Sequence, residues 1–477
     1  MNFYFEAAKV LDQLDAKKGS IKGIIGTLPE KDRKRTAALV IETLKFKPAL
    51  STIIKEAQLM KEERKKITSL NLALALVHDL LLAKGIQAGD GPIKQAVLRH
   101  KTRLSAELTK LKIKKGAKST VDLAQAEDAR VAQIPRYVRV NTALWSTDDA
   151  VSWYSSHGYT LSAPLLSERG FDKDEHIPDL LRFHPRVTFH EDECYKRGKI
   201  ILQDKASCFP AVVLNPPVSE HAVVIDATAA PGNKTSHLSA LMQGKGKLFA
   251  FERDRKRYQT LTRMLSKAGC KNVTPLNIDF LTIDPESEPY SAATHILLDP
   301  SCSGSGIVNR LDYLLDTEEN DLQGEDDRLS KLAAFQLMMI NHAMKFPRVQ
   351  CIVYSTCSIH ATENEHVVRE ALSGNPHFGM APPEGVLSSW TRRGIPEECA
   401  CPEHAQSMLR CMPGEDFTNG FFVSCFAKAA EPTAIEEPAT TATASKRPRE
   451  DDDGDAATKE APKPSKKSKK KRKKKHQ

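Results

Sequence analysis

The chain has 477 residues, 40% of them apolar and 27% charged, with a formal net charge of +9. This length allows two or three folded domains, and the apolar fraction is enough to build their cores. Ten cysteines in so long a chain, none before Cys194, argue against a disulfide-stapled secreted protein. The charged, amphipathic start is unlike a signal peptide, and no apolar run is long enough for a membrane span. We therefore expect a soluble, intracellular protein with reduced cysteines.

The first part of the chain is expected to be helical. Apolar residues recur three and four positions apart in several segments, and Asp90-Gly91-Pro92 is typical of a helix start. The predicted helices are Phe3–Leu14, Ala37–Phe46, Ile53–Met60 and Leu70–Leu82, with a last one that runs to Lys115. The pattern predicts a helical domain over residues 1–115, followed by a polar, Ala-rich linker over residues 116–134.

A small α+β unit is predicted over residues 135–202. Strands are expected at 137–141, 180–183 and 200–202, and Thr147-Asp148-Asp149 is typical of a helix cap. The basic residues in and beyond this unit include candidate contacts to RNA phosphates, although each alone is more simply an ordinary surface charge. These candidates are Arg136, Arg139, Lys205 and Arg310.

Residues 203–427 are predicted to form an α/β domain. Short apolar runs alternate with amphipathic helices, which indicates a mostly parallel sheet with helices on both faces. The expected strands are 222–225, 248–251, 273–276, 295–298 and 350–354, and the expected helices are 234–243, 255–268 and 332–346. Thr362–Glu365 has capping-box form and predicts one more helix. Residues 420–427 predict a final strand at the end of the sheet, and the acidic insert 316–327 predicts a mobile loop near the cleft.

The composition changes in residues 428–477. This segment holds 15 Lys and Arg against 9 Asp and Glu, a net charge of +6, so the rest of the chain carries about +3. It has too little apolar surface to fold, and we predict a disordered basic tail. Lys446-Arg447-Pro448-Arg449 and the run 466–475 resemble nuclear or nucleolar import signals, and a nonspecific RNA-binding tail has the same composition.

The segment Asp226–Thr235, with the sequence DATAAPGNKT, follows an apolar strand and opens a helix. Its small residues let a ligand approach the backbone, and the free N–H groups of a helix start favour a negative group such as a carboxylate. A kinase-type phosphate loop is excluded because Asn233 separates Gly232 from Lys234 and no Gly stands five positions before Gly232. The segment also lacks the G-x-G-x-x-G pattern of dinucleotide-binding proteins.

Acidic residues end four consecutive predicted strands. Glu252 lies 26 residues after Asp226, where a carboxylate can accept two hydrogen bonds from ribose hydroxyls. Asp279 follows the next strand and is placed to bind an adenine amino group, and Asp299 ends the fourth. Ligands of such sheets bind beyond the carboxyl ends of the strands, so four acids there favour a nucleoside with a cationic group. Any one of them alone is equally consistent with the cap of a helix or turn.

Two cysteines follow strand ends in loops of small residues. Cys302 lies in the sequence DPSCSGSG, which starts at Asp299, and Cys357 lies in YSTCS. A thiolate and a methyl donor together suit methylation of carbon 5 of a pyrimidine, because thiolate addition at carbon 6 makes carbon 5 nucleophilic. Asp299 is placed to stabilise charge at the ring nitrogen, and a base must then remove the carbon-5 proton. The residues alone do not order the two cysteines, and an isolated cysteine is more simply a small core residue.

Taken together, these segments resemble the Sun/Fmu-type (Nop/Sun) RNA cytosine-5 methyltransferases over residues 136–427. The matching motifs are Arg139-Val140-Asn141, Gln203–Ser207, Asp226–Thr235, Asp299–Cys302 with Ser355–Cys357, and, more weakly, Gly420–Val423. The most similar subgroup methylates large-subunit ribosomal RNA in eukaryotes. The resemblance implies a Rossmann-like class I methyltransferase fold with a mostly parallel seven-stranded sheet, preceded by an RNA-binding unit, and S-adenosylmethionine as the cofactor.

The resemblance also implies a role for each site residue. Cys357 is the nucleophile that attacks carbon 6, Cys302 assists product release, and Asp299 contacts both the cofactor and the cytosine. Many relatives have Cys at the place of Thr228, a conservative difference that we do not expect to affect catalysis. The residues implied to hold S-adenosylmethionine are Thr228, Ala229, Ala230, Pro231, Gly232, Asn233, Lys234, Glu252, Arg257, Asp279 and Asp299.

Other functions are open at this point. A DNA cytosine methyltransferase needs only the cysteine after the fourth strand, so the second cysteine and the motif at Arg139 favour RNA. An enzyme that acts on tRNA or another RNA is an alternative. A non-catalytic ribosome-assembly factor that binds RNA only as a scaffold is another, which the presence of Cys357 and Asp299 disfavours.

The partners and metal content are also predicted. We expect a monomer that binds large-subunit rRNA or a pre-ribosome, does not bind membranes, and reaches the nucleus and nucleolus through import machinery that recognises the basic tail. Zinc is suggested by a cluster near the C-terminal end of the α/β domain, but its C-x-C spacing is atypical of structural sites, and we predict no metal. The cluster is Cys399, Cys401, His404 and Cys411.

Overall fold

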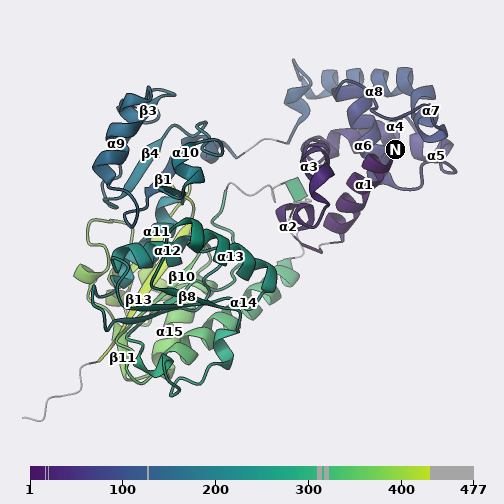
Figure 1. The fold of residues 1–477 in the computed structure, drawn as a ribbon. Helices are drawn as coiled ribbons and strands as arrows, with labels where there is room; N and C mark the ends of the chain where they lie inside the picture. The colour runs from purple at the N-terminus through teal and green to yellow at the C-terminus, as the bar shows by residue number, and fades with distance from the viewer. Residues whose placement is uncertain (17, 20, 126–127, 309–313, 316–321, 430–477) are drawn as a thin grey trace, which may run out of the picture. The chain divides into compact units, whose positions relative to one another are not determined.

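A computed structural model describes residues 1–16, 18–19, 21–125, 128–308, 314–315 and 322–429 (Figure 1). The predicted basic tail, Arg310 and residues 316–321 of the acidic insert lie outside these residues. The prediction of a loop is wrong for residues 322–327, which begin the long helix α14 (Leu322–Ala343). Acidic residues are favourable in the first turns of a helix, where they complement its dipole.

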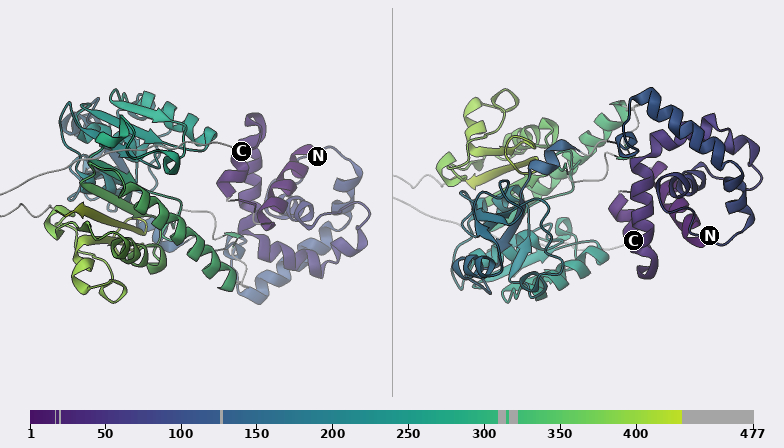
Figure 2. Two further views of the ribbon diagram at one scale, coloured as in Figure 1. Left: turned by 90° about the horizontal axis from the view of Figure 1, so that it is seen from below. Right: turned by 90° about the horizontal axis from the view of Figure 1, so that it is seen from above.

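The N-terminal segment is helical, as its purple and blue coils in Figure 2 show. Its centre is α6, in which every residue from Leu72 to Val77 is buried. The predicted helix at 53–60 is interrupted at Gln58, whose positive φ of 54° separates α4 from α5. The helices are α1 (Asn2–Asp15), α2 (Ile21–Gly26), α3 (Glu30–Lys45), α4 (Lys47–Glu56), α5 (Leu59–Glu62), α6 (Leu70–Leu82), α7 (Pro92–Arg99) and α8 (Lys101–Lys115). The predicted linker contains two short 3-10 helices, η1 (Val121–Leu123) and η2 (Ala129–Gln133).

The α+β unit contains a five-stranded sheet in the order β2-β3-β4-β1-β5. The central strand β1 pairs antiparallel with both β4 and β5, and aromatic side chains, among them Tyr154 and Phe183, fill the core beneath α9. The elements are β1 (Arg136–Val140), α9 (Thr147–Ser156), β2 (Thr160–Leu161), β3 (Gly170–Lys173), β4 (Leu180–Phe183), α10 (Glu193–Lys196) and β5 (Ile200–Leu202). Three strands and α9 were predicted; β2 and β3 are too short and too polar to give a period-two pattern.

The large sheet of the α/β domain has the strand order β11-β13-β10-β9-β6-β7-β8, with β12 as an eighth strand that pairs with β13. The five strands from β10 to β8 are parallel, which confirms the predicted mostly parallel, Rossmann-like sheet. The strands are β6 (Val223–Asp226), β7 (Lys247–Phe251), β8 (Val273–Leu276), β9 (His295–Leu298), β10 (Cys351–Thr356), β11 (Phe378–Met380), β12 (Met408–Cys411) and β13 (Phe421–Lys428).

The prediction that the last strand lies at the end of the sheet is wrong. β13 pairs antiparallel with β10 on one side and with β11 and β12 on the other. Every residue from Phe421 to Phe426 is buried, because the strand is covered on both faces and both edges. This continuous burial, rather than an apolar and polar alternation, is the mark of an interior strand.

Helices cover both faces of the large sheet (Figure 1). On one face, α11 and α12 pack their apolar residues against β6, β9 and β10, and α13 extends the layer. On the other face, α14 and α15 enclose a second core. The helices are α11 (Lys205–Leu214), α12 (Asn233–Leu241), α13 (Arg255–Lys267), α14 and α15 (Glu365–Gly374). Among the described helices, none combines the length and apolar character that crossing a membrane requires.

The start of α15 differs from the capping box predicted at Thr362–Glu365. Residues Ala361–Glu363 form the 3-10 helix η6, and α15 begins only at Glu365. The side chains of Glu363, Asn364 and Glu365 are fully buried and bind other segments, so they are not available to cap the helix. The remaining 3-10 helices are η3 (Phe280–Thr282), η4 (Tyr290–Ala292), η7 (Pro383–Gly385), η8 (Pro396–Glu398) and η9 (Pro402–Ser407).

Candidate active site

The predicted site residues gather at one edge of the large sheet. The parallel strands lie side by side in the order β10, β9, β6, β7, β8, so their carboxyl ends share that edge. The residues at these ends are, in the same order, Cys357, Asp299, Asp226, Glu252 and Asp279. The chain order reverses between β9 and β6, which is where ligands bind in such sheets. The structure therefore places the cysteines on one side of this crevice and the acids predicted for the nucleoside on the other.

Cys302 and Cys357 are in direct contact. Their Sγ atoms lie 2.8 Å apart, and both are half-buried cysteines that form no disulfide in the described part of the chain. The sulfur contact with Cys357, together with burial, raises the pKa of Cys302 above its ordinary value. Cys302 therefore keeps its proton at neutral pH beside the sulfur of Cys357.

Two glycines let the loop that carries Cys302 pass close to the start of β13. The Gly306 N–H donates to the carbonyl of Cys357 at 3.0 Å, and the Gly420 N–H donates to the carbonyl of Gly306 at 2.7 Å. A Cβ atom on Gly306 would lie 2.2 Å from the carbonyl oxygen of Gly420, a distance that no real contact allows. The backbone around both cysteines is thus fixed by hydrogen bonds that only glycine permits at position 306.

A lysine and a carboxylate lie next to the cysteines. Lys234 Nζ is 2.8 Å from Asp299 Oδ2 and donates to Ser207 Oγ at 3.0 Å. Ser355 Oγ donates to the other carboxylate oxygen of Asp299 at 2.8 Å, and the Asp299 N–H donates to Thr228 Oγ1 at 2.8 Å. Burial disfavours the charge of Lys234, but the Asp299 carboxylate outweighs it, and the net pKa of Lys234 is raised. Lys234 was predicted as a cofactor contact, whereas its amine lies on Asp299.

The loop after β6 is held from below by Asp226. This carboxylate is buried and accepts hydrogen bonds from Thr235 Oγ1 at 2.7 Å and from the Thr228 N–H at 3.3 Å. Burial raises the pKa of Asp226 to about 6. Arg257 donates to the carbonyl of Ala230 at 2.8 Å and braces the loop from α13. Asp226 therefore shapes the loop rather than facing a ligand.

The rest of the loop forms a close-fitting turn. Gly232 has a φ of 112°, and a Cβ there would press on Leu261 and Met264 of α13 at 3.2 Å. Ala229 and Ala230, before a cis peptide bond to Pro231, are buried against the same helix. The Asn233 side chain points away from the sheet edge and donates to the carbonyl of Leu202 at 3.3 Å.

The donor set fits S-adenosylmethionine. Glu252 ends β7 with one carboxylate oxygen bound to the Asp254 N–H and the other 3.5 Å from Arg257. Asp279 follows β8, binds the Leu281 N–H and lies 3.5 Å from Arg253. Two carboxylates at neighbouring strand ends, next to a loop of small residues that opens a helix, suit ribose hydroxyls, an adenine amino group and an amino-acid carboxylate.

Two positioning residues were not identified from the sequence. The fully buried Glu363 accepts hydrogen bonds from the N–H and the hydroxyl of Ser303, next to Cys302, and from Gln336 Nε2 at 2.9 Å. Tyr354 donates to Gln336 and to the carbonyl of Glu363, which ties this network to β10. The available signal was Glu363 in the sequence TENE after the Cys357 motif, but the match of this segment to a capping box concealed the role of Glu363.

Two of the four predicted phosphate contacts are wrong. Arg139 is 1% exposed and donates to Gln203 Oε1 at 2.8 Å, to Ser236 Oγ at 2.8 Å and to the carbonyl of Asn233 at 3.2 Å. Burial lowers its pKa to about 10. Lys205 is 3% exposed and pairs with Asp174 at 2.8 Å. Both charged side chains are therefore bound inside the protein and are not exposed to RNA.

The cysteine and histidine cluster considered for zinc is dispersed. Cys411 is buried in the core of the α11 face, and Cys399 donates to the carbonyl of Ile395. Within the described ranges, no three His, Cys, Asp or Glu side chains are arranged to hold a metal ion.

The sheet, the loop after β6 and the cysteines beyond β9 and β10 define a class I methyltransferase. A family model described as the 16S rRNA methyltransferase RsmB/F matches residues 211–427. Models for the N-terminal and the ferredoxin-like domains of NOL1/NOP2/Sun domain family member 5 match residues 34–124 and 134–203. A methyltransferase homologue from Pyrococcus horikoshii has the same fold, with a TM-score of 0.50 at 24% identity over 66% of this chain and 92% of that one.

Two curated relatives are similar over nearly their whole lengths. The 25S rRNA (cytosine-C(5))-methyltransferase rcm1 of Schizosaccharomyces pombe is 47% identical over 89% of this chain and 91% of its own. The 28S rRNA (cytosine-C(5))-methyltransferase of Mus musculus is 39% identical over 94% of this chain and 97% of its own. The chain therefore belongs to the NSUN5-type group of the Sun family of RNA cytosine-C5 methyltransferases.

Proposed function

We propose that this RNA cytosine-C5 methyltransferase modifies one cytosine of large-subunit ribosomal RNA with S-adenosylmethionine as methyl donor, during ribosome biogenesis in the nucleolus. The relatives with high identity are named for large-subunit rRNA, and the basic tail suits nuclear import. The observation that carries the chemistry is the pair of cysteine sulfurs 2.8 Å apart beside the Lys234–Asp299 ion pair.

Cys357 is the nucleophile in this proposal. Its sulfur forms a bond to carbon 6 of the cytosine, and the electron pair of the carbon 5–carbon 6 double bond moves toward the ring nitrogen and carbonyl. The ammonium of Lys234, held by Asp299, stabilises that negative charge, and Ser355 orients the Asp299 carboxylate that contacts the cytosine. Bound S-adenosylmethionine supplies an electrophilic methyl group to carbon 5.

Cys302 acts in the second half of the reaction. A base removes the proton from carbon 5, the bond between carbon 6 and the Cys357 sulfur breaks, and the ring double bond re-forms. The Cys302 sulfur lies 2.8 Å from the Cys357 sulfur, so Cys302 is placed to protonate the departing thiolate. The loop with Thr228 and Gly232, together with Glu252 at the end of β7, holds the donor on the other side of the crevice.

We further propose that the five predicted segments divide the work. Residues 203–427 catalyse, residues 135–202 bind RNA, and residues 1–115 form a separate helical domain joined by the linker 116–134. Residues 428–477 carry the import signal. The pairing of β1 with β4 and β5 in one five-stranded sheet supports treating residues 135–202 as a unit.

The test is methyl transfer from a radiolabelled donor to deproteinised large-subunit rRNA from cells that lack the protein, followed by bisulfite sequencing. The proposal predicts one modified cytosine with the wild type and none with Cys357→Ala. Equal transfer to tRNA would overturn the substrate assignment. Equal transfer by the wild type and Cys357→Ala would overturn the nucleophile.

A further inference from the structure

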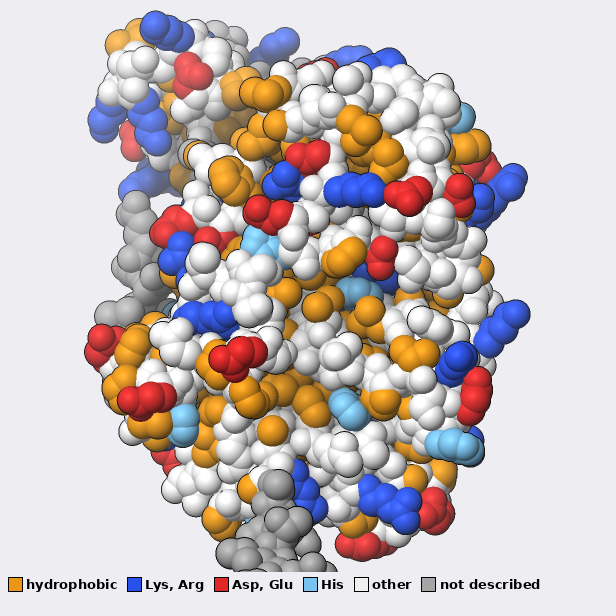
Figure 3. All heavy atoms as spheres, turned by 90° about the vertical axis from the view of Figure 1, so that its left-hand side faces the viewer, with side chains coloured by type: hydrophobic (Ala, Val, Ile, Leu, Met, Phe, Trp, Pro, Cys, Tyr) orange, Lys and Arg blue, Asp and Glu red, His pale blue; other side chains and the backbone are white. Residues whose placement is uncertain are grey.

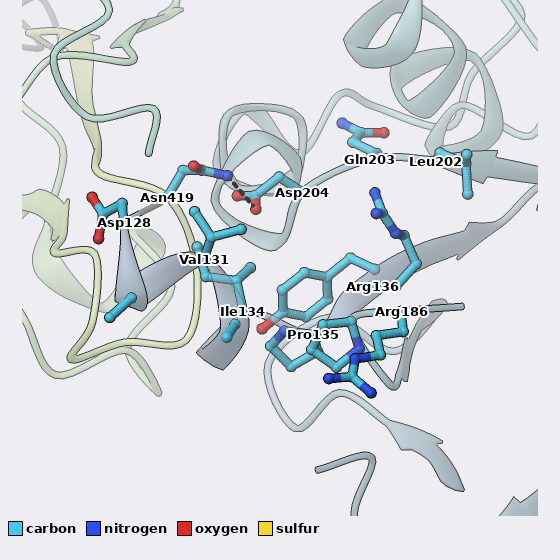
Figure 4. Close-up of a pocket in the computed structure, with 14 residues that line it drawn as sticks. Asp128, Val131, Ile134, Pro135, Arg136, Arg186, Leu202, Gln203, Asp204 and Asn419 are labelled. Carbon is cyan, nitrogen blue, oxygen red and sulfur yellow. Dashed lines mark hydrogen bonds between the residues drawn. The ribbon is translucent and has the colours of Figure 1, made fainter. Parts of the chain in front are cut away.

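A cavity of about 510 Å³ lies between η2, the start of β1 and the segment before α11 (Figure 4). Its size is within the range of about 300–1,000 Å³ that is usual for ligand pockets. Val131 and Ile134 face it from one side and Arg136 and Arg186 from the other, with Asp204 and Asn419 above. We call this cavity, with these six residues, the Arg136 pocket.

The Arg136 pocket has two arginines and two aspartates among its lining residues. The exposed side chain of Arg136 makes no hydrogen bond or ion pair with the described part of the chain. Arg186 is 82% exposed at its side chain and pairs with Glu168, which is itself 72% exposed, so their interaction is weak. The charge of Asp128, on the opposite wall, is neutralised by Arg130 at 2.6 Å.

The acid at the top of the pocket is bound by neighbouring groups of the protein. Asp204 accepts hydrogen bonds from Thr418 and from Asn419 at 2.8 Å, and burial raises its pKa. The face of the molecule in Figure 3 carries Lys and Arg side chains interspersed with Asp and Glu. An exposed arginine side chain without a partner in the described part of the chain, such as that of Arg136, is suited to contact a phosphate group.

The pocket also offers an apolar surface beside its charges. Val131, Ile134 and Pro135 line the pocket, and so does Tyr137, whose hydroxyl donates to the carbonyl of Phe417 at 2.9 Å. An apolar wall in the same pocket as an arginine suits a single unstacked nucleotide, whose phosphate and base need these two environments.

The pocket is connected to the catalytic cysteines by three steps along the backbone. Asn419 forms its wall, the next residue Gly420 donates to the carbonyl of Gly306, and the Gly306 N–H donates to the carbonyl of Cys357. Asn419 also accepts from the Val308 N–H at 3.2 Å, which links the wall to the loop of Cys302. The wall of the pocket and the loops of both cysteines are therefore joined by backbone hydrogen bonds.

We infer that the Arg136 pocket binds a nucleotide that flanks the target cytosine, with its phosphate on Arg136 and its base against Val131 and Ile134. This inference rests on the proposed function and adds the place at which single-stranded substrate RNA is held. It gives β1 two roles: Arg139 joins the two domains, and Arg136 holds the RNA.

The test compares methylation kinetics on deproteinised large-subunit rRNA for the wild type, Arg136→Ala and Arg136→Ala/Arg186→Ala. Loss of one charged phosphate contact should raise KM about tenfold at unchanged kcat, and it should reduce the dependence of RNA binding on log salt concentration by about one per contact. Arg136→Lys should recover part of the affinity but not the geometry of a forked contact.

Arg197→Ala is the matched control. Arg197 is 73% exposed, belongs to the same α+β unit and, like Arg186, pairs with an exposed glutamate, but it does not line the pocket. Its KM and salt dependence should equal those of the wild type. The inference is overturned if the double variant has a KM within twofold of the wild type and an unchanged salt dependence. An inactive wild-type protein would instead refute the proposed function, so the two failures are distinguishable.

Discussion

Arg139 offers the sharpest test of how β1 joins the two domains. In Arg139→Met, three hydrogen bonds from a charged donor are lost, each of which contributes roughly 1.5–3 kcal/mol. Methionine in turn avoids the burial of a charge, whose effect is seen in the lowering of the Arg139 pKa to about 10 and corresponds to roughly 3 kcal/mol. The balance is a loss of roughly 1.5–6 kcal/mol.

Thermal and urea unfolding measure this loss. Each kcal/mol of this decrease should lower the Tm by roughly 2–4 °C. Arg136→Met on the same strand is the matched control, because its exposed side chain should change stability by less than about 0.5 kcal/mol.

RNA binding separates the two arginines further. Below the melting temperature, the salt dependence of RNA binding should be unchanged in Arg139→Met and reduced in Arg136→Met. An Arg139→Met protein as stable as the wild type, but with a reduced salt dependence, would refute the burial argument and restore Arg139 as a phosphate contact.

Three further substitutions test the site. Glu363→Gln replaces a carboxylate that accepts three hydrogen bonds with an amide, so the loop of the release cysteine should loosen and a protein–RNA complex resistant to denaturant should accumulate; turnover equal to wild type would contradict this. Gly306→Ala places a Cβ 2.2 Å from the Gly420 carbonyl and should reduce methyl transfer more than about 100-fold, whereas Gly374→Ala, with open space around its Cβ, should not. The raised pKa of Asp226, about 6, means that the folded state holds this proton more tightly than the unfolded state. The stabilising contribution of the bound proton is complete below about pH 4 and is lost as the pH rises through 6. Asp226→Asn should therefore gain about 3 kcal/mol of stability relative to wild type between pH 4 and 7 in urea titrations, and a constant difference would contradict this.

The parallel core of the fold was predictable because each strand is a short apolar run between amphipathic helices. β8 and β9 lie where the sequence places them, and the acids and cysteines that follow each strand fall on one edge because parallel strands share their carboxyl ends. The motif at Asp226–Thr235 was equally local: small residues, a glycine and a helix start adjacent in the chain.

The remaining features depend on contacts between distant segments. The interior place of β13 depends on which strands pair with it, and a run of buried residues does not name its neighbours. Arg139 reads as a surface cation until Gln203 and Ser236 are brought beside it from 64 and 97 residues away. Glu363 lies in a segment that matches a capping box locally, but its carboxylate accepts a hydrogen bond from a serine 60 residues earlier. Long-range hydrogen bonding of this kind overrides local propensity.

The most direct measurement is a denaturing gel of the protein incubated with large-subunit rRNA and methyl donor. With Cys302→Ala, which retains the proposed nucleophile but lacks the proton donor, a covalent protein–RNA band should accumulate. With Cys302→Ala/Cys357→Ala the band should be absent. A band that persists without the Cys357 sulfur would contradict the covalent chemistry assigned to this site.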